Sequence, residues 1–178
     1  MKRRDALKNT AFFVGGTAAF STIGLTTGCT SAPQVDWTSM TDPFVRGLLE
    51  EIAETIIPVT DTPGAKDLKL VDHVSIMLAD CHEPEEQQDF LAGLKLAEEN
   101  CAKVNGKGFM ECTSEVRKEY LISVKDLSDD NAELAPAKSF FSRMKRLTLQ
   151  GYMKSEYVNT NITKYKLVPG PYIACTDA

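Results

Sequence analysis

Four cysteines carry the most obvious chemistry in the body of this chain. The chain begins with an export-type signal, described below, and an even set of cysteines in an exported domain predicts disulfides. A predicted helix over residues 85–103 separates Cys81 from Cys101 by roughly 25–30 Å, which is too far for a disulfide. The short loop that follows favours a bond from Cys101 to Cys112. Cys81 and Cys175 would then pair together, one of them would bond to another chain, or some of the four would remain free thiols.

Histidines and paired carboxylates are the other side chains that could do chemistry. His73 and His82 could bind a metal, with Cys81 beside the second, as in a metal-dependent hydrolase, but a surface or capping role suits them better. The carboxylates at residues 85–86 and 98–99 are predicted to be solvated charges, since a general acid needs burial. The sequence has no Gly-x-Gly-x-x-Gly cradle and no Cys-x-x-Cys motif. We therefore expect no catalytic, cofactor-binding or metal-binding residue in this chain.

The first 28 residues have the pattern of an export signal. Basic residues come first, an uncharged apolar stretch spans residues 11–25, and small residues follow. The apolar stretch has fifteen residues, fewer than the ~20 that a transmembrane helix needs, so we expect a signal and not a permanent span. The start resembles the twin-arginine signal, which exports proteins that are already folded, through Arg3, Arg4, Leu7 and Lys8. These residues predict delivery to the periplasm.

The end of the signal resembles a lipobox. Leu25-Thr26-Thr27-Gly28-Cys29 places a small residue before a cysteine that would become the acylated first residue of the mature chain. Bacterial lipoprotein cysteines carry several acyl chains, and two or more chains give stable anchoring. We therefore expect a signal over residues 1–28 and a polar tether over residues 29–41. If Cys29 is acylated, the protein is anchored to the membrane; cleavage without lipid is the alternative.

Charge and length describe one acidic domain after the signal. The first 28 residues hold four of the 20 basic side chains and one of the 25 acidic ones, so the remaining 150 residues hold 16 and 24 and a formal net charge of −8. An acidic domain without a basic block is a poor partner for nucleic acid, because that affinity comes mainly from neutralising phosphates. A length of 150 residues suits a single domain, which we place at residues 42–178.

Helical periodicity determines how these residues are positioned. Apolar side chains recur every three or four residues over five segments, which proline, glycine or polar turn residues separate. The pattern predicts helices over residues 43–57, 67–81, 85–103, 114–125 and 136–152, the first of them starting with the cap Asp42. No segment alternates apolar and polar residues as a strand would. The sequence therefore predicts an all-α bundle of about five helices.

The residues after the last predicted helix have a different character. Residues 156–178 lack a helical period and contain prolines and glycine, so we expect an irregular C-terminal tail. Tyrosines combine an apolar ring with a polar hydroxyl and are common at protein interfaces. The tail therefore either lies along a partner or packs back on its own bundle, held there by Cys175. The candidate interface residues are Tyr157, Tyr165, Pro169, Gly170 and Tyr172.

Several segments together resemble one family. They are Leu48-Leu49-Glu50-Glu51-Ile52-Ala53-Glu54-Thr55-Ile56-Ile57-Pro58, Asp61-Thr62-Pro63-Gly64-Ala65, Phe140-Phe141 leading to Thr148, Gly151-Tyr152-x-x-Ser155-Glu156, and Tyr165-x-x-x-Pro169-Gly170-x-Tyr172-x-x-Cys175. In this order, and behind a twin-arginine-like leader, they are similar to the gluconate 2-dehydrogenase subunit 3 family, the small (gamma) subunits of bacterial FAD-dependent sugar dehydrogenases. The resemblance spans roughly residues 44–175.

The resemblance implies a noncatalytic escort. Its export signal would take a FAD-bearing catalytic subunit of the glucose–methanol–choline type across the membrane, and its domain would help that subunit to mature. FAD would lie in that large subunit, which oxidises the sugar, and electrons would pass to a separate acceptor such as a cytochrome c. The resemblance assigns no cofactor to this chain. The other hypothesis is a stand-alone periplasmic helical lipoprotein that binds a ligand or an envelope protein.

Overall fold

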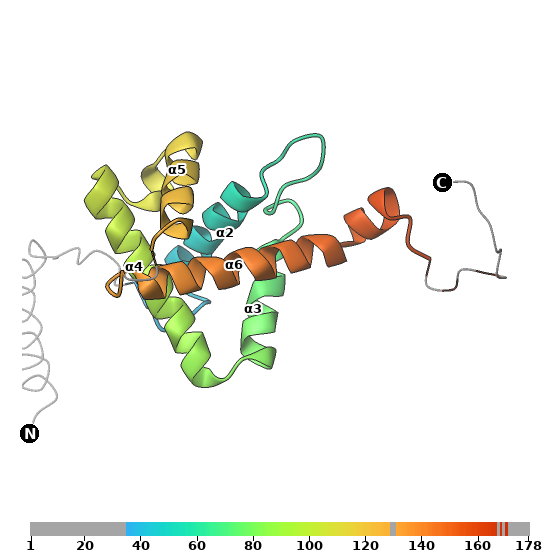
Figure 1. Ribbon diagram of the computed structural model, residues 1–178. Helices are drawn as coiled ribbons and strands as arrows, with labels where there is room; N and C mark the ends of the chain where they lie inside the picture. Colours follow the sequence, from blue (N-terminus) through green and yellow to red (C-terminus); the bar gives the residue numbers. More distant parts are fainter. Residues whose placement is uncertain (1–34, 129–130, 167, 169, 171–178) are drawn as a thin grey trace, which may run out of the picture. The chain divides into compact units, whose positions relative to one another are not determined.

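A computed structural model describes residues 35–128, 131–166, 168 and 170, and within them the protein is helical with no strand, which confirms the predicted all-α fold (Figure 1). Two short helices, η1 and η2, accompany the five main ones. The elements are α2 (Pro43–Ile56), α3 (Leu70–Cys81), α4 (Pro84–Asn105), η1 (Phe109–Glu111), α5 (Ser114–Lys125), α6 (Ala135–Lys154) and η2 (Val158–Ile162).

Local chemistry explains the start of α2 and the end of α4. Asp42 caps α2 by accepting hydrogen bonds from the backbone N–H groups of Phe44 (2.8 Å) and Val45 (3.3 Å), as its place before Pro43 predicts. α4 ends at Gly106, whose φ of +70° lies in the left-handed region that glycine adopts without steric cost. α3 begins at Leu70, later than the predicted residue 67, because the chain before it is held in turns described below.

The core forms around α6, which packs against the other four main helices and most extensively against α4 and α3. The buried residues of α6 recur with helical spacing. Fully burying a leucine, methionine or phenylalanine side chain stabilises the fold by about 1.5–3 kcal/mol. Where α6 meets α4, the rings of Phe140 and Phe90 stack edge to face with centroids 4.8 Å apart. The buried residues of α6 are Ala137, Phe140, Phe141, Met144, Leu147, Thr148 and Gly151.

The C-terminal tail is more regular than predicted, because η2 is a π-helical turn over Val158–Ile162. The sequence gives no apolar period here, but asparagine and threonine side chains bond to nearby backbone carbonyls, as Asn159 does to Ser155 (3.0 Å) and Thr160 to Glu156 (2.7 Å). Val158 packs inward with 2 % of its surface exposed. The prediction of an irregular tail is therefore wrong for residues 158–162.

Several predicted features lie outside the described residues. They are the export signal with Arg3, Arg4, Leu7 and Lys8, the lipobox with Cys29, and the tail residues Pro169, Tyr172 and Cys175. Among the residues that the structure describes, no helix is long and apolar enough to cross a bilayer.

Candidate partner interface

The C-terminal end of α6 presents apolar side chains to solvent. In Figure 1 the last turns of α6 and the η2 turn extend beyond α3. Leu149 and Met153 lie four residues apart, and therefore on one face of the helix, with 42 % and 59 % of their surfaces exposed. In the segment that follows, Ile162, Tyr165 and Val168 are also exposed, at 53 %, 64 % and 82 %. Single exposed apolar residues are ordinary, but a concentration of this kind in one segment is typical of a binding surface.

A shallow groove lies at the junction of α6 and η2. It has a volume of about 500 Å³, and the loop before α3 forms one wall while the junction of α6 and η2 forms the other. Its surface combines both signs of charge with hydroxyl and amide groups, which can pair with a polar partner surface. We call it the α6–η2 groove; it is lined by Asp67, Leu68, Lys69, Ser155, Glu156, Tyr157, Thr160 and Asn161.

Ser155 shapes the wall that α6 and η2 contribute. Its hydroxyl donates to the carbonyl of Tyr152 (2.7 Å) and accepts from the N–H of Val158 (3.3 Å), which ends α6 and starts the next turn. The π-helical turn that follows is a conformation found often at functional sites. Lys164, with φ of +51°, then reverses the chain so that the N–H of Tyr165 bonds to the carbonyl of Asn159 at 2.8 Å.

Lys69 gives the opposite wall an uncommon backbone conformation. Its φ of +50° is in the left-handed region, which costs free energy for a residue with a side chain. The strain is maintained by the bonds around it: the N–H of Lys69 donates to the carbonyl of Lys66 (3.0 Å), and Leu70 donates to Ala65 (3.0 Å). Asp67 accepts from the N–H of Gly64 (3.3 Å) in the same turn. This wall is therefore fixed by the turn that precedes it.

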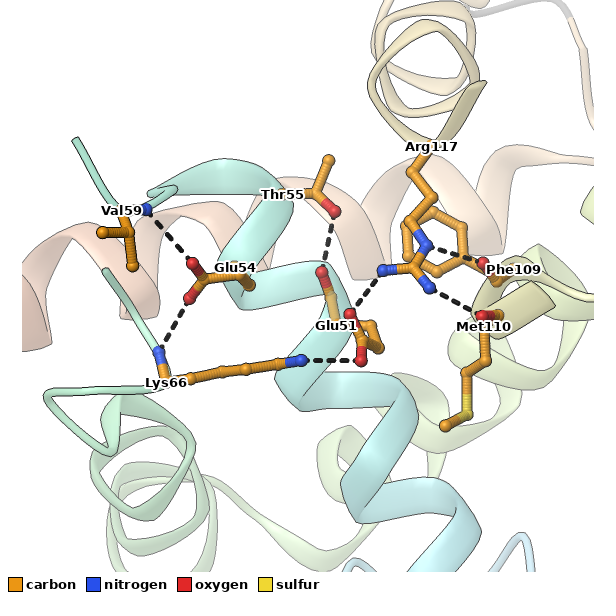
Figure 2. Close-up of polar contacts among 8 residues, drawn as sticks. All are labelled: Glu51, Glu54, Thr55, Val59, Lys66, Phe109, Met110 and Arg117. Carbon is orange, nitrogen blue, oxygen red and sulfur yellow. Dashed lines mark hydrogen bonds and ion pairs between the residues drawn. The ribbon is translucent and has the colours of Figure 1, made fainter. Parts of the chain in front are cut away.

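A polar network on α2 holds the turn that precedes α3 in place (Figure 2). Glu54 accepts from the backbone N–H groups of Val59 (3.1 Å) and Lys66 (2.9 Å), at the two ends of the turn. Glycine suits the position between them, because a Cβ on Gly64 would lie 2.6 Å from a carboxylate oxygen of Glu54 and would push that side chain from its hydrogen bonds. The motif from Asp61 to Ala65 thus places the groove wall against α2.

Glu51 and Arg117 extend the network to η1 and α5. Glu51 accepts from the guanidinium of Arg117 and from the ammonium of Lys66 (2.6 Å). Arg117 also donates to the carbonyls of Phe109 (2.9 Å) and Met110 (2.6 Å), and its guanidinium lies 5.5 Å from the centre of the Phe109 ring. Burial raises the pKa of Glu51, but the two cations outweigh it, so the pKa lies below its usual value and the carboxylate stays charged.

The predicted interface tyrosines fall on this surface in different ways. Tyr157 lines the groove, while Tyr165 lies exposed beyond it together with Gly170. The tail also packs partly on its own domain, because Val158 is buried. The loop residues Asp67 and Lys69 were not predicted as part of the site, since their role arises from a turn held by distant residues.

The histidines do not form a site together, because they lie at opposite ends of α3. His73 packs against Gly151 of α6, and burial, followed by the nearby Lys154, lowers the pKa of its imidazole. His82 follows the last residue of α3 and lies 3.6 Å from Glu86. Among the described residues no group of three histidine, cysteine or acidic side chains is arranged to hold a metal ion.

The cysteines are free thiols in the described part of the chain, where Cys81 is exposed, Cys101 buried and Cys112 half-buried. The disulfide between Cys101 and Cys112 is therefore not formed in this structure, and the pairing stays a prediction. One expectation nearby is wrong: Glu98 is not a fully solvated charge. It accepts from the N–H of Phe109 (3.0 Å), and burial raises its pKa.

The described residues form an all-helical domain with a polar groove where α6 meets η2. The family model of Gluconate 2-dehydrogenase subunit 3 matches residues 46–170, and the chain belongs to this family. It is thus a subunit of a dehydrogenase complex, whose other subunits are its partners. The matched range includes all eight residues of the α6–η2 groove. Neither the comparison with curated proteins nor that with solved structures gave a match.

Proposed function

We propose that this chain is the noncatalytic small subunit of a periplasmic FAD-dependent sugar or alcohol dehydrogenase. It escorts the catalytic flavoprotein through twin-arginine export and aids its maturation. The observation that carries this proposal is the family match over the folded domain. It is supported by the leader of the same chain, in which Arg3 and Arg4 precede an uncharged stretch.

In this proposal the redox chemistry belongs to the partners. A large subunit of the glucose–methanol–choline type holds FAD and oxidises the substrate, and its electrons pass to a separate acceptor such as a cytochrome c. This chain supplies the export signal and the surface that binds the large subunit. If Cys29 is acylated, the chain also anchors the complex to the membrane.

The α6–η2 groove and its apolar margin are the proposed contact with the flavoprotein. Interfaces typically have an apolar centre with a polar rim, and Met153, Ile162 and Tyr165 provide apolar surface next to the charged and amide groups of the groove. The tyrosines, whose rings lose little conformational entropy on binding, suit the same purpose.

The export role is tested by changing both Arg3 and Arg4 to lysine and co-expressing the chain with its large subunit. We expect both proteins to remain in the cytoplasm, measured by fractionation and by dehydrogenase activity in the periplasm. Lys118→Arg, an exposed change on α5, is the control and should leave export unchanged. Normal export of the flavoprotein with the altered leader would refute the escort role.

The contact is tested by Met153→Asp against Ile122→Asp. Both residues are exposed, at 59 % and 46 %, but Ile122 lies on α5, away from the groove. We expect at least a tenfold loss of co-purified flavoprotein for Met153→Asp and little loss for Ile122→Asp, with unchanged helix content in both. Equal retention by the two variants would place the contact elsewhere. A chain that stays monomeric beside its large subunit would instead support the stand-alone lipoprotein.

A further inference from the structure

The loop after α4 brings two thiols together. Cys101 lies in the last turns of α4 with none of its surface exposed, and Cys112 follows the last residue of η1 and is half-buried. Gly106 reverses the chain between them. Both side chains belong to the same packed region, since Cys112 packs against the core cluster that contains Cys101. Asn105 donates to the sulfur of Cys101 at 3.4 Å, and Cys112 donates to the carbonyl of Lys107 at 3.8 Å.

Contacts other than the thiols hold this loop in place. The Phe109 side chain is 2 % exposed, its N–H bonds to Glu98, and its carbonyl accepts from Arg117. The N–H of Cys112 donates to the carbonyl of Phe109 at 3.3 Å. The fold therefore holds the loop between the two thiols against α4 while they are reduced, so most of the entropic cost of closing this loop is met on folding.

From this arrangement we infer that Cys101 and Cys112 form a disulfide site which is closed after the domain has folded, by thiol–disulfide exchange with a protein disulfide. The inference does not depend on the flavoprotein partner proposed above. It fits a chain that folds in a reducing compartment and then reaches an oxidising one.

The two thiols differ in how they can react. Burial, more than any other factor, raises the pKa of Cys101 to about 11, so this thiol stays protonated at neutral pH. Cys112 is the more accessible sulfur, and its thiolate would attack the disulfide of the oxidant, releasing one thiol of that protein and leaving a mixed disulfide. Cys101 would then attack the sulfur of Cys112 and release the second thiol. The pair loses two electrons and two protons, and the oxidant disulfide takes them up as two thiols.

The closed bond would tie η1 to α4. A disulfide that closes this loop of twelve residues restricts the unfolded chain and so stabilises the fold. For a protein of this size we expect the melting temperature to rise by roughly 6–10 °C. Because Arg117 donates to carbonyls on η1, the bond would also hold the acceptors of that arginine in place.

The test uses the full chain, reduced and then treated with a purified oxidase of the thioredoxin fold in its disulfide form. We expect the reduced chain to have full helix content, and the oxidised chain to contain a cross-linked peptide joining Cys101 to Cys112 with the melting temperature raised as above. Before oxidation, a maleimide should label Cys112 faster than Cys101. Cys112→Ser should remove the temperature increase, whereas Cys81→Ser, an exposed control, should keep it.

Three outcomes would overturn the inference. The first is an unfolded reduced chain, because the site would then not be preformed. The second is the absence of the cross-linked peptide after treatment, and the third is equal labelling of both cysteines. Because Cys112 is only half-buried, its serine variant is expected to fold, and circular dichroism checks this directly.

Discussion

Arg117 gives the sharpest test of how the fold is held together. Its side chain is 15 % exposed and it serves three acceptors: the Glu51 carboxylate and the carbonyls of Phe109 and Met110. Arg117→Met keeps the apolar stem and removes all the donors. Because these acceptors come from α2 and η1, the variant should loosen both from α5.

The size of the effect follows from what each acceptor loses. A carbonyl left without its donor costs about 1 kcal/mol, and a carboxylate that loses a charged donor costs about 1.5–3 kcal/mol. Glu51 keeps Lys66 and is 21 % exposed, so its share lies at the low end. We expect Arg117→Met to lower the free energy of unfolding by about 3–4 kcal/mol, which moves the urea midpoint down by roughly 1.5–2 M.

Equilibrium urea unfolding followed by circular dichroism measures this change. Lys118→Met, an exposed substitution of similar shape next to Arg117, is the matched control and should shift the midpoint little. The double variant that also carries Glu51→Gln should lose less stability than the two single variants lose together, since the residues interact directly. If Arg117→Met and Lys118→Met have the same midpoint, the network contributes nothing to stability and the reasoning is wrong.

Three further predictions concern the turn between α2 and α3 and the contact of α4 with η1. Gly64→Ala should lower the free energy of unfolding by about 1–3 kcal/mol, because its Cβ would lie 2.6 Å from Glu54; an unchanged urea midpoint would contradict this. Tyr152→Phe removes the hydrogen bond from the tyrosine hydroxyl to Thr62 (3.1 Å) and should cost about 0.5–1.5 kcal/mol in the same assay. Burial raises the pKa of Glu98 in the folded state, so the unfolded chain ionises first and stability should fall as pH rises above about 4.3. Glu98→Gln should remove that fall, and identical pH profiles of the urea midpoint would refute the assignment.

Sequence reasoning succeeded where the causes are local. Asp42 and Pro43 start α2, and Gly106 ends α4, because a cap or a left-handed glycine acts on the residues next to it. The stripe on α6 repeats over five turns, which is long enough for periodicity to decide the element. The number of main helices was therefore predictable without knowledge of how they pack.

Sequence reasoning failed where the causes are distant in the chain. Glu98 is half-buried because η1 folds back over α4, and a 3₁₀ helix of three residues leaves no periodic signal. α3 starts late because Lys69 takes a left-handed conformation in a turn that Glu54 holds from α2. The loop wall of the groove depends on such distant contacts, so the sequence alone could not locate it. Tyr157, on the other wall, was proposed from its residue type alone.

α6 runs without a break from the core to the end of the helix that carries Met153. One unbroken helix carries Phe140 into the core and Met153 to the margin of the groove. A helix is stiff along its axis, so a fault in core packing displaces the docking residues as well. In the escort role proposed above, a chain with a misfolded core would therefore fail to bind the flavoprotein and would reach the export machinery without it.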